Sequence, residues 1–304
     1  MGSGINGVIV VDKPGGMTSA RVVGAVKRAL QVKKIGHTGT LDPMATGVLP
    51  LCIGEGTKVA GYLLAEDKEY EGELLLGVET DTLDREGQVQ SEARMEAALV
   101  TREQLLQAMA RFVGPIEQVP PMFSALKQDG RRLHQLARQG VEVERKARSI
   151  VVHSFELLSF SESRARFSVA ASKGTYVRSL VYDVGRVLGC GAHLTELRRT
   201  RSGKFSLSEA VTLDQLQLGA GDIRVVDPVA AISHLPSVRV PADQLSSVAD
   251  GKRLSWELVS SVEPPSGVFA LLTPDGRALV AIVEIEEERL RYRRVFNYGL
   301  TRDP

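Results

Sequence analysis

The sequence has few cysteines, no long apolar run and almost no net charge, and each absence excludes a class of protein. Cys52 and Cys190 are its only cysteines, and neither has metal-ligand spacing. They predict buried reduced thiols in a cytosolic protein. No apolar run approaches the roughly 18 residues that a membrane-spanning helix needs. The first residues lack a basic region followed by an apolar stretch, so we expect no secretory signal and a cytoplasmic location.

The net charge of +1 taken alone argues against a strongly basic nucleic-acid-binding protein. The charges are unevenly distributed, however. Acidic residues prevail from Glu66 to Glu103, and basic residues prevail from Lys127 to Lys204. A basic region of this kind can supply phosphate contacts in a chain that is nearly neutral overall, although a solvated basic face gives the same pattern.

The chain of 304 residues is long enough for two domains, and 43% hydrophobic with 25% charged residues is typical of a globular protein. We predict an α+β unit over residues 1–232 and a small β-rich barrel over residues 233–304. Strands are expected at 8–11, 48–53, 70–78, 149–160, 164–172, 192–200, 267–272, 278–285 and 291–295. Helices are expected at about 18–30, 57–64, 101–113, 175–188 and 214–215.

Residues 120–148 differ from their surroundings. They contain Pro120-Pro121, a short helical pattern around 132–138 and many cations, but little that could be buried. We predict a protruding arm that becomes ordered on a partner.

The loop of residues 36–50 is the most informative segment. Gly36, Gly39 and Gly47 allow backbone angles that other residues avoid, and they let a ligand approach the main chain. Pro43 biases Asp42 toward an extended conformation, so the Asp42 side chain should project from the loop. A carboxylate presented in this way can be a nucleophile, a general base or only part of a turn.

This loop and three other segments together resemble the bacterial tRNA pseudouridine(55) synthases, the TruB family. The four segments are residues 12–19 (DKPGGMTS), 36–50 (GHTGTLDPMATGVLP), 172–179 (SKGTYVRS) and 197–199 (LRR). The resemblance also includes 67–70 (DKEY) and 119–127 (VPPMFSALK), and it covers about residues 5–215. Phe123 stands where the family often has Tyr, and Thr40 where Ala is common. Neither departure touches the proposed chemistry.

The resemblance implies a pseudouridine-synthase-like mixed central sheet flanked by helices, with a PUA-like RNA-binding domain at the C-terminal end. It implies isomerisation of the uridine at position 55 in the tRNA T-loop. The N1–C1′ bond breaks, the uracil turns, and C5 joins C1′. The reaction includes no redox step and no external group, so it requires no cofactor or metal.

The implied partner is tRNA, held by its T-arm and, through the C-terminal domain, by its acceptor end. We expect a monomer without an obligatory protein partner, and an additional tRNA-folding role is compatible with the family. Base flipping costs a few kcal/mol. Cations of the arm and of residues 198–201 are expected to offset this cost by contacting phosphates.

The resemblance implies three catalytic residues. Asp42 has the central role, with the choice left open between addition to uracil C6, capture of C1′ and action on a sugar proton. Arg178 is inferred to pair with Asp42, lower its pKa and keep it ionised, although a helix-surface cation is the alternative. Tyr70 would stack on the flipped base and accept the C5 proton. Without the resemblance, the simpler interpretation of Tyr70 is a strand residue half-packed against the sheet.

Four more residues complete the expected substrate-binding set. Tyr176 would line the pocket and hydrogen-bond the base or Asp42. Leu197 would contact the base, although a core leucine is the simpler interpretation. His37 would fill the space that the flipped nucleotide leaves, since no second His or Cys is spaced to share a metal. Lys13 would bind phosphate or brace the Asp42 loop.

Three other functions remain open on the residues alone. An RNA-folding factor would use the arm and barrel without chemistry. A guide-RNA-dependent synthase would need partners, whereas the chain's own arm favours an independent enzyme. A glycosidase would release free uracil, which mass spectrometry would detect because isomerisation leaves the mass unchanged.

Overall fold

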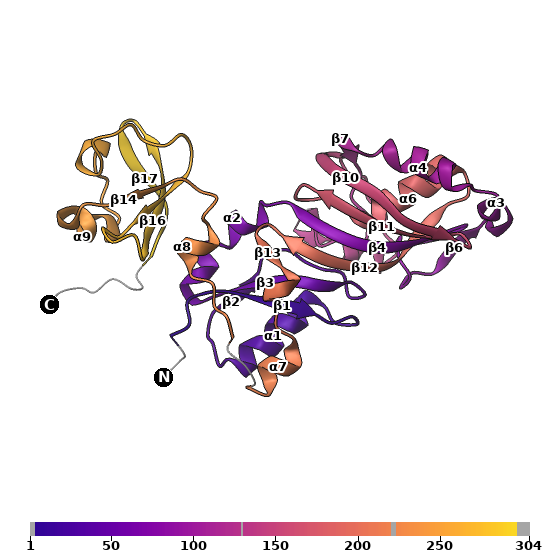
Figure 1. The fold of residues 1–304 in the computed structure, drawn as a ribbon, viewed down its shortest axis with the longest axis horizontal. Helices are drawn as coiled ribbons and strands as arrows, with labels where there is room; N and C mark the ends of the chain where they lie inside the picture. The colour runs from indigo at the N-terminus through magenta and orange to yellow at the C-terminus, as the bar shows by residue number, and fades with distance from the viewer. Residues whose placement is uncertain (1–3, 129, 220–222, 297–304) are drawn as a thin grey trace.

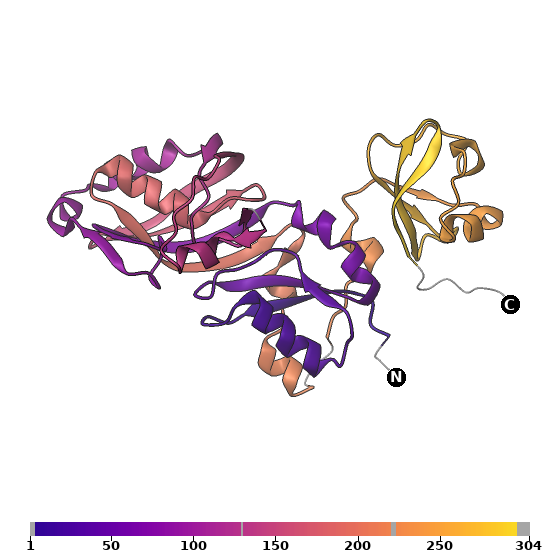
Figure 2. The ribbon, with the colours of Figure 1, turned by 180° about the vertical axis from the view of Figure 1, so that it is seen from behind.

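A computed structural model describes residues 4–128, 130–219 and 223–296. Figure 1 and the reverse view in Figure 2 show a large part built on one long sheet and a smaller C-terminal part at one end of it. Within the described ranges, no helix is long and apolar enough to cross a membrane.

The large part is organised by a sheet of nine strands. They are β1 (Gly7–Lys13), β2 (Ile35–His37), β3 (Thr46–Ile53), β4 (Lys68–Leu76), β7 (Gly114–Gln118), β10 (Arg148–Ser161), β11 (Arg164–Ala171), β12 (Ala192–Ser202) and β13 (Phe205–Ser206). The order is β1-β3-β12-β4-β11-β10-β7, with β2 paired to β3 and β13 paired to β12. The β3–β12 ladder is parallel and the others are antiparallel, which confirms the expected mixed sheet.

Gly47 shows why a glycine is needed where the parallel ladder forms. Its φ is +102°, and a Cβ there would lie 2.2 Å from the carbonyl oxygen of Arg199 on β12. A side chain at this position would therefore push β3 and β12 apart.

Helices and short turns connect these strands. They are α1 (Ser19–Ala29), η1 (Gly54–Lys58), α2 (Ala60–Leu64), α3 (Arg94–Ala98), α4 (Arg102–Ala110), α6 (Val177–Leu188), η2 (Leu207–Glu209), α7 (Leu213–Gln217) and α8 (Pro228–Ala231), with a small hairpin of β5 (Val78–Thr80) and β6 (Val89–Glu92). Thr18 caps α1, and a capping box of Thr101 and Gln104 begins α4. The expected 57–64 helix is divided between η1 and α2.

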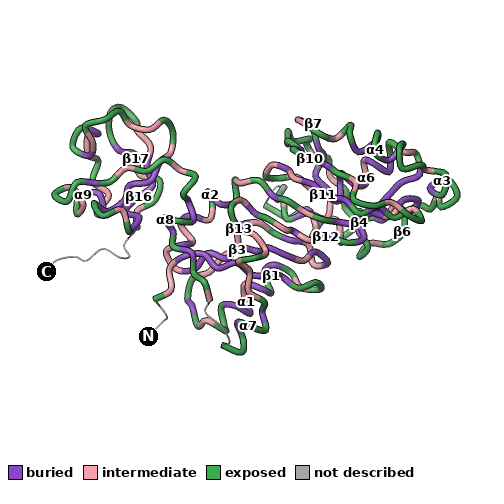
Figure 3. Tube along the Cα trace, viewed as in Figure 1, coloured by how far each residue is buried: buried purple, intermediate pink, exposed green. Residues whose placement is uncertain are grey.

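The main core lies between the sheet and the long helices. From α6 it takes Leu180, Val181 and Val184, which are fully buried, and α1 contributes Val22 and Val26. Burial of each such side chain stabilises the fold by roughly 1.5–3 kcal/mol. Figure 3 shows buried positions along the strands and exposed ones at the loops and outer helix faces.

The C-terminal part contains β14 (Ser237–Arg239), η3 (Ala242–Gln244), α9 (Leu245–Ala249), η4 (Trp256–Leu258), β15 (Phe269–Leu272), β16 (Leu279–Glu286) and β17 (Arg289–Val295). The three expected strands are present as β15, β16 and β17. The sheet order is β14-β15-β16-β17, and no ladder among the described residues joins β14 to β17. The expected β-rich unit is thus present as a four-stranded sheet, and its closure into a barrel remains a prediction.

The two parts share one apolar cluster. It joins Val8 and Leu63 of the large part to Ala270 and Ile282 of the small one. A domain division near residue 232 remains a prediction, since this packing continues across it.

The arm, residues 120–148, is folded in its described portion. It contains β8 (Lys127–Gln128), β9 (Arg131–Arg132) and α5 (Leu133–Ala137). Leu133 and Leu136 are buried at 3% and 6% exposure, so the expectation that the arm has little to bury is wrong. Periodicity could not show this, because the helix is only five residues long.

Candidate active site

A cleft of about 520 Å³ lies where the Asp42 loop meets β4, β12, the root of the arm and the beginning of α6. Five of the seven residues selected from the sequence line it. They are Asp42, Tyr70, Tyr176, Arg178 and Leu197. Residues from four distant segments are thus brought to one cavity, as the resemblance implied.

His37 and Lys13 do not line this cleft. His37 is half-buried on β2, and its Nδ1 accepts a hydrogen bond of 3.3 Å from the Gly39 amide. Burial, and then the charge of Arg199, lowers the His37 pKa, so the ring is neutral near pH 7. In the parts of the chain that the structure describes, no group of three or more His, Cys, Asp or Glu side chains is arranged to hold a metal ion.

Lys13 braces the Asp42 loop from behind. Its side chain is fully buried, and Nζ donates to the carbonyl oxygens of Pro14, Pro43 and Ala45 at 2.9, 3.1 and 2.7 Å. Burial lowers the Lys13 pKa to about 8. Of the two roles considered, the structure supports the brace, because all three ammonium protons already have acceptors.

The other side of the loop is held by α1. The Leu41 amide donates to Ser19 Oγ at 2.9 Å, and that hydroxyl donates to the Leu41 carbonyl at 3.1 Å. Leu41, the residue before Asp42, is therefore fixed through both its amide and its carbonyl. This limits the positions that the Asp42 carboxylate can take.

Arg178 pairs with Asp42, as expected. Its Nε lies 2.9 Å from Oδ2 of Asp42, and its Nη2 donates to Oδ1 at 3.1 Å. The guanidinium is 4% exposed, whereas 32% of the Asp42 side-chain surface stays open. The carboxylate thus faces the cleft with its cation behind it.

The sequence reasoning missed Asp84, a second carboxylate on the same guanidinium. Asp84 Oδ2 lies 3.3 Å from Nη1 of Arg178, and both side chains are 4% exposed. Arg178 also donates to the carbonyls of Thr82 and Phe123 at 2.8 and 2.9 Å. Nothing in the local pattern of residues 84–87 indicates that Asp84 is buried against a helix nearly a hundred residues away.

The net pKa shift of Asp42 is upward, and it has two opposing causes. Burial raises the pKa of the Asp42 carboxyl above its ordinary value, and the charge and hydrogen bond of Arg178 oppose this effect without cancelling it. The nearby charge of Asp84 adds to the increase. Arg178 does lower the Asp42 pKa, as expected, but the expectation left out the larger cost of taking the carboxylate out of water.

Two basic residues near the cleft have structural roles that the sequence did not reveal. Arg199 is 1% exposed and donates from Nε to the Val48 carbonyl at 2.7 Å and from Nη2 to the Gly39 carbonyl at 3.2 Å. Arg198 is ion-paired with Asp12 at 2.8 Å. Arg199 is therefore committed within the protein, whereas Arg198 and Arg201 are ion-paired with 41% and 51% of their side-chain surface exposed, and their contacts to phosphates remain a prediction.

Lys68 was also missed as a site residue. It lines the cleft, and Nζ donates to the Leu64 carbonyl at 2.8 Å. Burial lowers the Lys68 pKa to about 8. The sequence held a signal for this position: Lys68 lies two residues before Tyr70 on β4, and alternate residues of a strand point to the same face.

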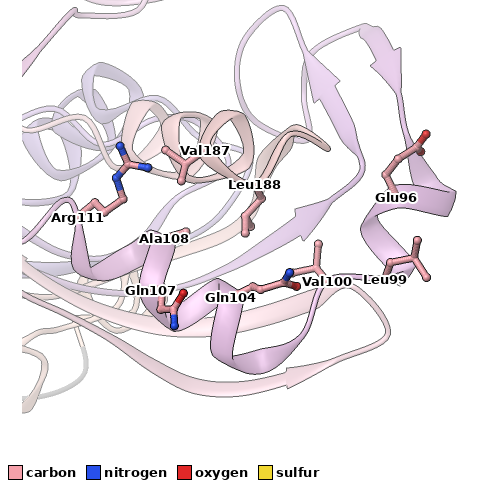
Figure 4. A pocket seen from close by; sticks show the side chains of 9 residues that line it. All are labelled: Glu96, Leu99, Val100, Gln104, Gln107, Ala108, Arg111, Val187 and Leu188. Atoms are coloured by element: carbon pink, nitrogen blue, oxygen red, sulfur yellow. The ribbon is translucent and has the colours of Figure 1, made fainter.

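A second hollow lies away from this cleft, among α3, α4 and α6 (Figure 4). Its lining combines Gln104, Gln107 and Arg111 with apolar side chains such as Leu99 and Val187. None of the predicted site residues contributes to it.

What the first cleft can do follows from its contents. The cleft contains the partly open carboxylate of Asp42, the buried guanidinium of Arg178 and the phenols of Tyr70 and Tyr176. Leu197 forms part of its apolar lining. A flat ring can stack on such aromatic and apolar surfaces while the carboxylate reaches an adjoining sugar carbon or ring carbon.

Comparison with known proteins agrees with this geometry. Residues 27–177 match the family model of the TruB family pseudouridylate synthase N-terminal domain, and residues 178–222 match that of the tRNA pseudouridylate synthase B C-terminal domain. The tRNA pseudouridine synthase B of Pseudomonas aeruginosa (strain UCBPP-PA14) is 53% identical over 294 residues, covering 96% of each chain. That of Aromatoleum aromaticum is 50% identical over 254 residues, covering 83% of this chain and 82% of the relative.

Solved structures give the same result. The crystal structure of a Cbf5-Nop10-Gar1 complex contains a chain with a TM-score of 0.71 and 29% identity, covering 95% of this chain and 84% of that one. An H/ACA RNP bound to a substrate RNA containing 2′-deoxyuridine gives a TM-score of 0.70 at 27% identity, covering 96% and 85%. With two family models matched in succession and close relatives along most of its length, the chain belongs to the TruB family of pseudouridylate synthases.

Proposed function

We propose that this member of the family converts the uridine at position 55 in the tRNA T-loop to pseudouridine, with Asp42 as the carboxylate that acts on the nucleoside. The observation that carries the proposal is the Asp42–Arg178 pair, whose cation is buried while the carboxylate stays open to a cleft with two tyrosines. The two relatives described above are named tRNA pseudouridine synthase B, which supports tRNA as the substrate.

The roles of the other cleft residues are part of the same proposal. Tyr70 stacks on the flipped uracil, and its phenol accepts the C5 proton. Tyr176 and Leu197 complete the pocket, and Arg178 orients Asp42 and balances its charge. His37 lies outside the cleft lining, which fits a residue that occupies the space vacated in the T-loop better than one that touches the uracil.

The test is an Asp42→Asn variant incubated with one unmodified tRNA transcript and no additives. Asn keeps the shape but is neither a nucleophile nor a base, so single-turnover pseudouridine formation should be abolished. Because Asn can still accept a hydrogen bond from Arg178, the cleft should keep its form and tRNA affinity should change little. Chemical mapping of pseudouridine measures the first quantity, and filter binding measures the second.

Normal product formation by Asp42→Asn would contradict the assignment. Pseudouridine at a position other than the T-loop uridine would leave the chemistry intact but refute the proposed substrate. Release of free uracil would instead favour a glycosidase.

A tRNA-folding role beside the catalysis is the second proposal. It predicts that Asp42→Asn still accelerates folding of a misfolded tRNA, because the cleft and the arm remain. Loss of folding assistance together with catalysis would reject a separate role.

We further propose that the chain acts as a monomer in the cytoplasm without protein or guide-RNA partners, and that its C-terminal part is PUA-like and contacts the acceptor end. The structural neighbours come from multi-component assemblies, so this needs its own test. Purified protein should modify a bare T-arm stem-loop. Activity that requires an added protein or guide RNA would refute independence.

A further inference from the structure

Gln118 is a buried polar residue next to the cleft that the proposed chemistry does not use. It is the last residue of β7, is 2% exposed, and does not line the cleft. Both polar atoms of its side chain bind the same distant residue. The Tyr176 amide donates to Oε1 at 2.8 Å, and Nε2 donates to the Tyr176 carbonyl at 3.1 Å.

Tyr176 needs this support because it immediately precedes α6. Its backbone is extended, with φ −103° and ψ 106°, and its own side chain makes no capping bond. Its carbonyl also accepts the first helical bond, from the Leu180 amide at 3.2 Å. Gln118 therefore fixes the point at which the chain turns from the 172–175 loop into the helix.

Two functional side chains depend on that point. The Tyr176 phenol lines the cleft, and Arg178 stands two residues further along and pairs with Asp42. A rotation of the 176 peptide would move both of them, because helix geometry links their directions. Within the described residues, the Gln118 side chain makes hydrogen bonds to Tyr176 alone.

Gln118 also lies at the root of the arm. In the β7–β10 ladder it is opposite Arg148, where the arm returns to the sheet, and Arg148 lines the cleft. A little further on, the Phe123 carbonyl accepts from Arg178. The base of the arm and the beginning of α6 thus form one connected unit.

We propose that Gln118 is a positioning residue for the isomerisation: by holding the Tyr176 peptide through two hydrogen bonds, it places the Tyr176 phenol and the Arg178 guanidinium correctly around Asp42. This inference rests on the proposed function of the cleft. It assigns Gln118 an effect on the rate of the chemical step and not on tRNA binding.

Two variants of similar length test it. Gln118→Met removes both hydrogen bonds. Gln118→Glu keeps the acceptor for the Tyr176 amide, but it can donate to the Tyr176 carbonyl only when protonated, and burial should raise the pKa of that glutamic acid. The measurements are the single-turnover rate of pseudouridine formation and the tRNA Kd from pH 5 to pH 9. The thermal unfolding midpoint is determined at each pH, so that rates refer to folded protein.

We expect Gln118→Met to lower the single-turnover rate at least about ten-fold at every pH and to change the tRNA Kd less than about three-fold. A ten-fold lower rate corresponds to about 1.4 kcal/mol, which is within the usual cost of removing buried hydrogen bonds. The rate of Gln118→Glu divided by that of the wild type should rise as the pH falls, because protonation restores the second bond. Gln104→Met is the control, since it removes a side-chain bond at the beginning of α4, outside the cleft.

A wild-type rate in folded Gln118→Met would overturn the proposal. So would a Gln118→Glu to wild-type ratio that does not change with pH, or a loss confined to Kd. These failures differ from failure of the proposed function itself, in which the wild-type protein would form no pseudouridine.

Discussion

Asp42 combines two opposing requirements in one side chain. Arg178 and the partial opening to the cleft favour the ionised form, whereas burial disfavours it, and the net effect raises the pKa of the Asp42 carboxyl. A carboxylate that is less stable when ionised is a better base and nucleophile, so the cost of burial favours the chemistry that we propose for Asp42.

The raised pKa predicts the acid side of the pH–rate profile. In the proposed function the reactive form of Asp42 is the carboxylate, so the single-turnover rate should fall as the pH is lowered through the Asp42 pKa. Since that pKa is raised, the fall should begin at a higher pH than it would for an ordinary aspartate. Rates measured from pH 4 to pH 8 check this. A profile that stays flat down to the ordinary aspartate pKa would contradict it.

At the scale of elements, the Asp42 loop is fixed by contacts from its flanks. Lys13 on β1 and Ser19 on α1 bind loop carbonyls and amides, and Arg199 on β12 binds the Gly39 carbonyl. Three elements thus hold the Asp42 loop, which is preceded only by the short strand β2. Such support is what keeps a catalytic side chain in one position.

Removing the Lys13 brace should affect catalysis more than binding. Lys13→Met leaves the Pro14, Pro43 and Ala45 carbonyls without their donor, at a cost of roughly 1–3 kcal/mol for a buried group left unsatisfied. We expect a single-turnover rate at least about ten-fold lower and a nearly unchanged tRNA Kd. Lys27→Met, an exposed position on α1, is the control. A loss mainly in Kd would instead support the phosphate-binding alternative.

At the scale of the whole molecule, the cleft is lined by the sheet and the root of the arm, and the C-terminal part packs on β1, β3 and α2 through one shared apolar cluster. Lys127 and Arg138 of the arm are exposed and form no ion pair with another described residue, unlike Arg198. The arm is therefore a better source of phosphate contacts than the 198–201 cluster.

Neutralising these arm cations should weaken tRNA binding and its salt dependence. For the Lys127→Gln and Arg138→Gln double variant, the slope of log affinity against log salt should decrease by about 0.9 for each duplex phosphate that the protein no longer neutralises. The rate at saturating tRNA should change little. Arg102→Gln with Arg111→Gln, two exposed cations at the ends of α4, is the matched control. An equal effect of the control pair would show only a general charge effect.

The sequence by itself determined most of the strands of the two main sheets, although it missed the short strands β2, β7, β13 and β14, and its family resemblance selected five residues that line the cleft. It could do so because strand periodicity and the family's short motifs are local patterns that can be recognised along the chain. It failed at Asp84, Gln118 and the buried leucines of the arm, and it expected Arg199, which is buried, to contact phosphates. Only the tertiary structure decided these, because burial and the choice of hydrogen-bond partner depend on segments far apart in the chain. For the same reason only the tertiary structure decided the direction of the Asp42 pKa shift. That shift is the net result of removing the carboxylate from water, which raises the pKa, and of the distant Arg178 guanidinium, which lowers it.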